Sequence, residues 1–276
     1  MSLLLALFAQ VGPFVTPGPQ TVSPLPPELE EREAPGRTGE DAEPPKSDLE
    51  RCLVDSKSDT KRAVALAEKW FGKAQGVAKA QAGHCLGVTL ARMELWDEAA
   101  AAFIAARDAL VGEDLAYRAR LGAMAGNALL AEGQVQTALD ALDGAHGDAQ
   151  TAGHGDMAGS IAMDRARALV ALGRENEAEA ALTEAREALP GDAQAWLLSA
   201  TLSRRMDKLA EAQAQIEKAA EMLPVDPEIG LEAGRIAMLS GREEAARKSW
   251  QSVVDAAPDS EAAKKAQTYL EQLDSR

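Results

Sequence analysis

One spacing constrains the fold of this chain more than any other feature of its sequence. Four positions in the second half recur twice at intervals of 34 residues. The three sets are Gly173, Ala178, Leu182 and Pro190, then Asp207, Ala212, Ile216 and Pro224, and finally Gly241, Ala246, Trp250 and Pro258. A single globular core has no reason to maintain such an interval, whereas a stack of helical hairpins does.

Five units can be aligned on this spacing, and they begin near Ala80, Ala119, Gly159, Ala193 and Pro227. The eighth residue of each unit is small: Gly87, Gly126, Ala166, Ala200 and Gly234. The twenty-fourth is large: Phe103, Leu142, Leu182, Ile216 and Trp250. Small residues belong where two helix axes approach closely, and the proline near the end of a unit cannot continue a helix. Each unit is therefore predicted to be a pair of packed helices.

This pattern resembles the tetratricopeptide repeat, a helix-turn-helix unit of about 34 residues. The resemblance implies an all-α fold, a right-handed α-solenoid of such hairpins closed by a C-terminal capping helix. We expect units near 48–79, 80–113, 119–152, 159–192, 193–226 and 227–260, with the cap at 261–276. No segment shows sustained apolar and polar alternation, so we expect essentially no strand.

The chain departs from the repeat pattern in two ways. Position 4, which is large in the family, is small in four units: Gly83, Gly122, Ala162 and Gly230. The first helices are therefore expected to pack more loosely than is usual. The steps between the units that begin at Ala80, Ala119 and Gly159 are 39 and 40 residues. Because Gly144–Asp156 is rich in Gly, Asp and His, we interpret it as a longer turn.

The N-terminal region divides into two segments before the repeats begin. Residues 1–15 are largely apolar but too short to span a bilayer, and they resemble a secretory signal. Residues 16–47 are rich in proline and acids and are predicted to be a disordered linker. We expect an exported, periplasmic protein whose mature chain has no integral membrane segment; the alternative is a cytoplasmic protein with an exposed apolar tail.

The two cysteines, Cys52 and Cys85, are 33 residues apart. In the fold that the resemblance implies, residues about one repeat apart lie on adjacent first helices, so a disulfide between them is geometrically reasonable. Such a bond belongs in an oxidising compartment. In the cytosol, both would instead be small buried thiols.

Composition and motifs exclude several classes of function. The net charge is −15 with no basic stripe, which argues against nucleic acid and anionic lipid as partners. The sequence contains no phosphate-binding glycine loop, zinc helix or nucleophile elbow. We therefore predict no catalytic residue, no cofactor and no metal. One alternative is a metal-dependent regulator or enzyme that uses the His146–Asp156 turn, which carries two histidines and two aspartates.

The resemblance also implies a binding surface, because members of the family bind partners in a concave groove lined by the first helices. Transferred position by position, the groove consists of His84, Asn127, Met163, Arg167, Leu197, Thr201, Arg204, Leu231, Arg235 and Met238. His84 and Val88 stand where members that bind acidic chaperone tails have Lys and Asn, so that ligand is not transferred.

The predicted function is a non-enzymatic scaffold for a protein or peptide segment that is apolar with an acidic group. For any single residue of the set, packing within the solenoid is the favoured interpretation, whereas binding is favoured for the groove as a whole. A structural self-association module is a further alternative, although the polar capping helix favours a monomer.

Overall fold

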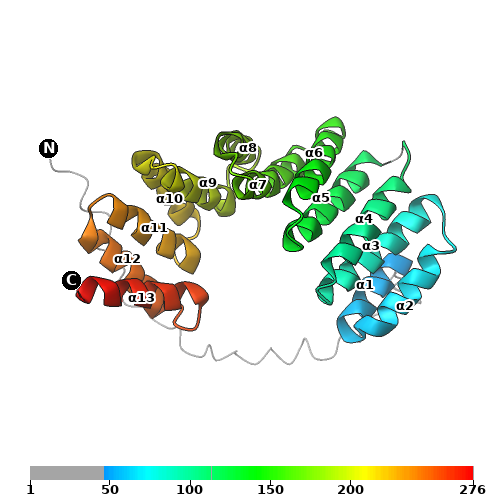
Figure 1. The fold of residues 1–276 in the computed structure, drawn as a ribbon, viewed down its shortest axis with the longest axis horizontal. Helices are drawn as coiled ribbons and strands as arrows, with labels where there is room; N and C mark the ends of the chain where they lie inside the picture. Colours follow the sequence, from blue (N-terminus) through cyan, green and yellow to red (C-terminus); the bar gives the residue numbers. More distant parts are fainter. Residues whose placement is uncertain (1–46, 113, 276) are drawn as a thin grey trace, which may run out of the picture. The chain divides into compact units, whose positions relative to one another are not determined.

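The structure is a computed structural model, and it describes residues 47–112 and 114–275. The apolar segment 1–15 and the linker up to residue 46 lie outside this part. The described residues form thirteen α-helices and no strand, as predicted. Six consecutive hairpins followed by one cap account for all of them (Figure 1).

In each hairpin the first helix is odd-numbered and the second is even-numbered. The bounds are α1 (Asp48–Ser58), α2 (Thr60–Phe71), α3 (Gly76–Arg92), α4 (Trp96–Asp108), α5 (Leu115–Ala131), α6 (Val135–Thr151), α7 (Gly155–Ala171), α8 (Glu175–Ala188), α9 (Ala193–Arg205), α10 (Leu209–Met222), α11 (Pro227–Leu239), α12 (Glu243–Ala256) and α13 (Glu261–Asp274). Each helix packs against the next along the chain, and α13 covers both α11 and α12. The arrangement is an all-α solenoid.

Contacts between small and large repeat positions hold each hairpin together. A Cβ atom added to Gly126 would lie 2.5 Å from the Leu142 side chain, and one added to Gly234 would lie 2.1 Å from the Trp250 indole. Leu142 and Trp250 are both buried. The glycines therefore let the first helix of a hairpin lie directly against the large residue of the second.

The small residues at position 4 do not loosen the hairpins, so that prediction was wrong. A Cβ atom added to Gly122 would lie 2.9 Å from the Cβ of Ala145, and one added to Gly230 would lie 2.5 Å from a Val253 methyl. Neither position leaves space for a Cβ atom, so at both sites the backbone of the first helix is in close contact with the second helix.

Aspartate side chains cap the starts of two of the first helices. The Asp226 side chain accepts hydrogen bonds from the first turn of α11, whose first residue is Pro227, and Asp192 caps α9 in the same way. Inside the hairpins, Glu94 and Asp207 replace the turn glycine and still adopt a left-handed φ of 60°. This conformation is unfavourable for residues with a Cβ atom, so the packing of the two helices imposes it.

The interpretation of Gly144–Asp156 as a longer turn was wrong. Helix α6 continues to Thr151 and α7 begins at Gly155, so the extra residues lengthen helices. Ala145 and Ala149 are fully buried, and His146 is 9% exposed. Burial of this face outweighs the cost of two helix glycines, which is about 1 kcal/mol each.

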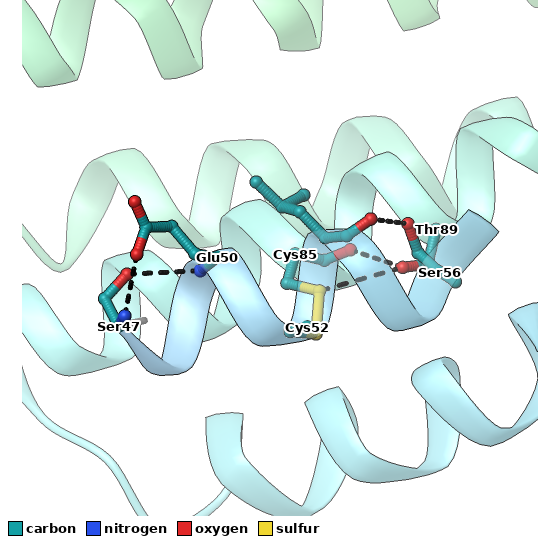
Figure 2. Close-up of a disulfide and its surroundings, with 7 residues drawn as sticks. Ser47, Glu50, Cys52, Ser56, Cys85 and Thr89 are labelled. Atoms are coloured by element: carbon teal, nitrogen blue, oxygen red, sulfur yellow. Dashed lines mark hydrogen bonds between the residues drawn. A yellow bond between two sulfur atoms is a disulfide. The ribbon is translucent and has the colours of Figure 1, made fainter. Parts of the chain in front are cut away.

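A disulfide between Cys52 and Cys85 joins α1 to α3, with the two Cα atoms 6.1 Å apart (Figure 2). Cys85 is fully buried, and the Thr89 hydroxyl beside it donates to the Cys85 carbonyl at 2.7 Å. At the start of α1, Ser47 and Glu50 form a reciprocal capping box. The least regular hairpin is thus fixed to the rest of the stack covalently.

Candidate functional site

The candidate site is the surface of α3, α5, α7, α9 and α11 on which the ten predicted residues lie, called here the first-helix face. The structure gives these residues three kinds of environment. Those buried in the core are His84, Met163 and Leu231. Those half-buried are Leu197, Thr201, Arg204, Arg235 and Met238, and those exposed are Asn127 and Arg167. Contact with a partner is therefore open to seven of the ten without rearrangement.

Apolar surface remains half-exposed along the face at one repeat position. Position 12 is occupied by Ala91, Leu130, Val170, Arg204 and Met238 in successive hairpins, and all five side chains are half-buried. Four of them are apolar, and they pack against the core clusters from the outside. Their remaining exposed area is available for burial by another molecule.

A first polar bridge crosses the face between α5 and α7. The Asn127 amide donates to Asp164 at 2.8 Å, and Arg167 pairs with the other oxygen of the same carboxylate. The Asp164 side chain is 14% exposed, whereas that of Arg167 is 44% exposed. One carboxylate thus neutralises one guanidinium, and the bridge as a whole has no net charge.

A second bridge crosses the face between α9 and α11. The Nε of Arg204 donates to Glu232 at 2.5 Å, and Arg235 contacts the other Glu232 oxygen at 3.3 Å. The Glu232 side chain is only 6% exposed. A buried carboxylate needs such partners because removing it from water is otherwise costly. Two arginines share one glutamate here, so the bridge carries one surplus positive charge.

At the N-terminal end of the face, a buried histidine lies within hydrogen-bond distance of a tyrosine. The Tyr117 hydroxyl, on α5, lies 3.0 Å from Nδ1 of His84 on α3. Burial, with a smaller effect from the Arg120 charge, lowers the pKa of His84 to about 4, while burial raises the pKa of Tyr117 to about 12. Both groups are neutral near pH 7, so the histidine tautomer decides which of the two donates this hydrogen bond. Nearby Arg120 is exposed.

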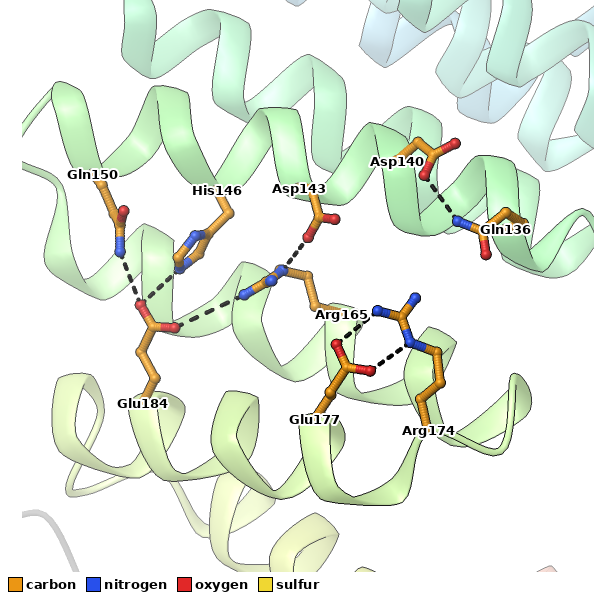
Figure 3. A network of polar contacts seen from close by, with 9 residues as sticks. All are labelled: Gln136, Asp140, Asp143, His146, Gln150, Arg165, Arg174, Glu177 and Glu184. Atoms are coloured by element: carbon orange, nitrogen blue, oxygen red, sulfur yellow. Dashed lines mark hydrogen bonds and ion pairs between the residues drawn. The ribbon is translucent and has the colours of Figure 1, made fainter.

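A third polar network lies on α6, α7 and α8 (Figure 3). Arg165 donates to Asp143 at 2.6 Å and approaches Glu184, which also bonds His146 at 2.7 Å. Asp143, Arg165 and Glu184 border a cleft of about 280 Å³, whose apolar walls include Leu139, Leu169 and Ala181. Every charged group of the network already has a partner of opposite charge or a hydrogen bond, so it fastens neighbouring hairpins together.

The four residues of the proposed metal-binding turn do not come together in the structure. His146 and Asp148 lie within α6, where His146 bonds Glu184 and Asp148 pairs with Arg107 and Arg118. His154 precedes α7, and Asp156 lies in its first turn. Within the described ranges, no three His, Cys, Asp or Glu side chains are grouped as a metal would require.

Comparisons with known proteins match the fold. No family model matches the sequence, and no curated protein matches it. Among solved structures, PilW, described as a widely conserved type IV pilus biogenesis factor, superposes with a TM-score of 0.64 at 16% identity, covering 80% of this chain and 99% of that one. PilF from Pseudomonas aeruginosa gives 0.61 at 13% identity, with coverage of 80% and 97%.

YrrB, described as a TPR protein with an unusual peptide-binding site, gives a TM-score of 0.51 at 20% identity, with coverage of 76% and 98%. This chain has the tetratricopeptide-repeat fold. At these identities the likeness establishes the fold alone. Within the described part of this TPR chain, no helix combines the length and apolarity needed to cross a membrane.

Sequence reasoning missed the acidic partners of the groove arginines. Asp164 and Glu232 both occupy position 6 of their units, directly after the predicted groove residues Met163 and Leu231. Among the five aligned units, position 6 is a carboxylate only at Asp164 and Glu232; in the first aligned unit it is Cys85. An acid at position 6 beside an arginine at position 9, three residues later on one helix face, is the signal that could have identified both bridges.

Proposed function

We propose that this protein is a non-enzymatic scaffold that binds a peptide or helical segment of another protein on its first-helix face. The half-exposed strip at position 12 carries the proposal. It runs through five successive hairpins, and its apolar members can bury further surface only against another molecule. The neighbouring arginines add polar groups that can orient a bound segment.

We also propose that the protein works in the cell envelope, in the periplasm of a bacterium. The Cys52–Cys85 disulfide supports an oxidising compartment, and the apolar residues 1–15 have the composition of a secretory signal. Intact mass of the protein from its own cells, with thiol alkylation before and after reduction, tests both points. Two free thiols in a full-length chain would contradict export.

Site-specific photocrosslinking in cells tests the binding face. A photoreactive amino acid replaces Leu130, Val170 or Met238, and the matched control replaces Ala101, an exposed residue on α4. The proposal predicts the same protein adduct at the three strip positions and none at the control. Adducts at Ala101 alone, or equal labelling at all four positions, would remove the first-helix face as the binding surface.

A further inference from the structure

The two bridges on the first-helix face differ in their charge balance. Between α5 and α7, Asp164 pairs with Arg167 alone, so the charges cancel. Between α9 and α11, Glu232 pairs with both Arg204 and Arg235, and one positive charge is left over. The three groove arginines, one in each of the last three units, therefore have different capacities for an additional anion.

The surplus charge also lies where a partner could reach it. The Arg204 side chain is 13% exposed, and its Nε is committed to Glu232. The Arg235 side chain is 39% exposed, and its 3.3 Å contact with Glu232 uses one of its two terminal nitrogens, so further donors remain for a partner. Glu228, also on α11, lies seven residues before Arg235, about 10 Å along the helix, too far to neutralise it.

We propose that Arg235, supported by Arg204, is the point at which the first-helix face recognises an acidic side chain of the bound segment. This inference rests on the proposed function and adds the chemistry of the partner. Along position 12, apolar residues flank Arg204 on both sides, with Val170 before it and Met238 after it. A segment that covers these residues continues past the arginines in both directions, so the carboxylate comes from an Asp or Glu within it.

The test uses short capped peptides as probes and the full chain labelled with 15N. Acetyl-Leu-Glu-Leu-amide carries the acidic side chain, and acetyl-Leu-Gln-Leu-amide is its neutral control. Acetyl-Leu-Ala-Leu with a free carboxylate distinguishes a chain terminus from a side chain. The Nε–Hε signals of Arg204, Arg235 and Arg167 report binding at each bridge separately.

The expected result is a saturable shift of the Arg235 signal with the Glu peptide, with a dissociation constant on the order of 1 mM. The Gln peptide and the free-carboxylate peptide should bind roughly tenfold more weakly. Arg235→Gln should reduce affinity for the Glu peptide roughly tenfold, whereas Arg167→Gln should leave it within about twofold. Glu232→Gln removes the competing internal carboxylate and should raise the affinity severalfold.

Several outcomes would overturn the inference. These are no saturable shift up to roughly 20 mM peptide, equal binding of the Glu and Gln peptides, or loss of binding in Arg167→Gln as well. Weaker binding in a folded Glu232→Gln variant, checked by its circular dichroism, would also contradict it. Each of these leaves the proposed function intact if the position-12 crosslinks persist, whereas loss of the crosslinks removes the face itself.

Discussion

Removing the disulfide should loosen the first hairpin and leave the remaining ones unchanged. Cys52 and Cys85 close a loop of 33 residues. In the chain-entropy account, closing a loop of this size removes enough unfolded-state entropy to stabilise the folded state by about 3.7 kcal/mol. Because each hairpin of a solenoid contacts only its neighbours, this loss should appear in α1 and α2 rather than throughout the chain.

Hydrogen exchange followed by mass spectrometry measures this effect one helix at a time. Comparing the oxidised protein with the Cys52→Ser, Cys85→Ala double variant, we expect protection of α1 and α2 to fall by up to about 500-fold, the equivalent of 3.7 kcal/mol. Peptides from α11 and α12 are the internal control and should exchange as before. Unchanged protection in α1 and α2, or an equal loss in every helix, would refute the reasoning.

Three other perturbations test the packing, the buried histidine and the electrostatics. In urea denaturation, Gly126→Ala should lower the free energy of unfolding by about 2 kcal/mol, because the added Cβ would lie 2.5 Å from Leu142. Gly147→Ala is the matched control: its added Cβ would have no neighbour within 4 Å, so the variant should raise the free energy of unfolding by about 0.5–1 kcal/mol. The folded pKa of His84, about 4, lies below its ordinary value of 6.5. The contribution of neutral His84 to the free energy of unfolding is therefore complete above pH 6.5, and it falls by about 1.4 kcal/mol per pH unit as the pH decreases toward 4. This part of the pH dependence should disappear in His84→Gln. Raising NaCl from about 20 to 150 mM should leave binding of the Glu peptide unchanged or tighten it, since screening weakens repulsion by the chain's net charge of −15; severalfold weakening would contradict this.

The sequence predicted the helices and their contacts well where one repeat position specifies one contact. A glycine at position 8 and a large residue at position 24 are required together, as Gly234 and Trp250 show. The start of α11 depends on Pro227 and on the adjacent Asp226 that caps the helix. These features are local or recur at a constant interval, so a single sequence reveals them.

The prediction failed where local preference and tertiary packing disagree. The glycines and aspartate of 144–156 favour a turn, but buried Ala145, His146 and Ala149 keep the chain helical to Thr151. This outcome depends on what α6 packs against, which the residues of the segment do not encode by themselves.

A related reason explains why the sequence alone did not distinguish the three groove arginines. Arg167, Arg204 and Arg235 occupy similar positions, but different carboxylates compensate their charges. Asp164 lies on the same helix as Arg167, whereas Arg204 on α9 pairs with Glu232 on α11. The pairing of Arg204 with Glu232 spans 28 residues and depends on the register of α9 against α11. A repeat alignment places residues within a unit, whereas charge balance is a property of the contact between units.

The charge distribution connects these observations with partner choice. A chain of net charge −15 repels acidic proteins at long range, so an acidic residue on a partner is normally unfavourable at its surface. The surplus charge shared by Arg204 and Arg235 reverses this preference at one place on the first-helix face. A segment with several acids would still be repelled elsewhere, and one with none would leave Arg235 without an anion. The arrangement therefore favours a mainly apolar segment with a single acidic residue in register with α9 and α11, and it selects that segment by excluding others as much as by attraction.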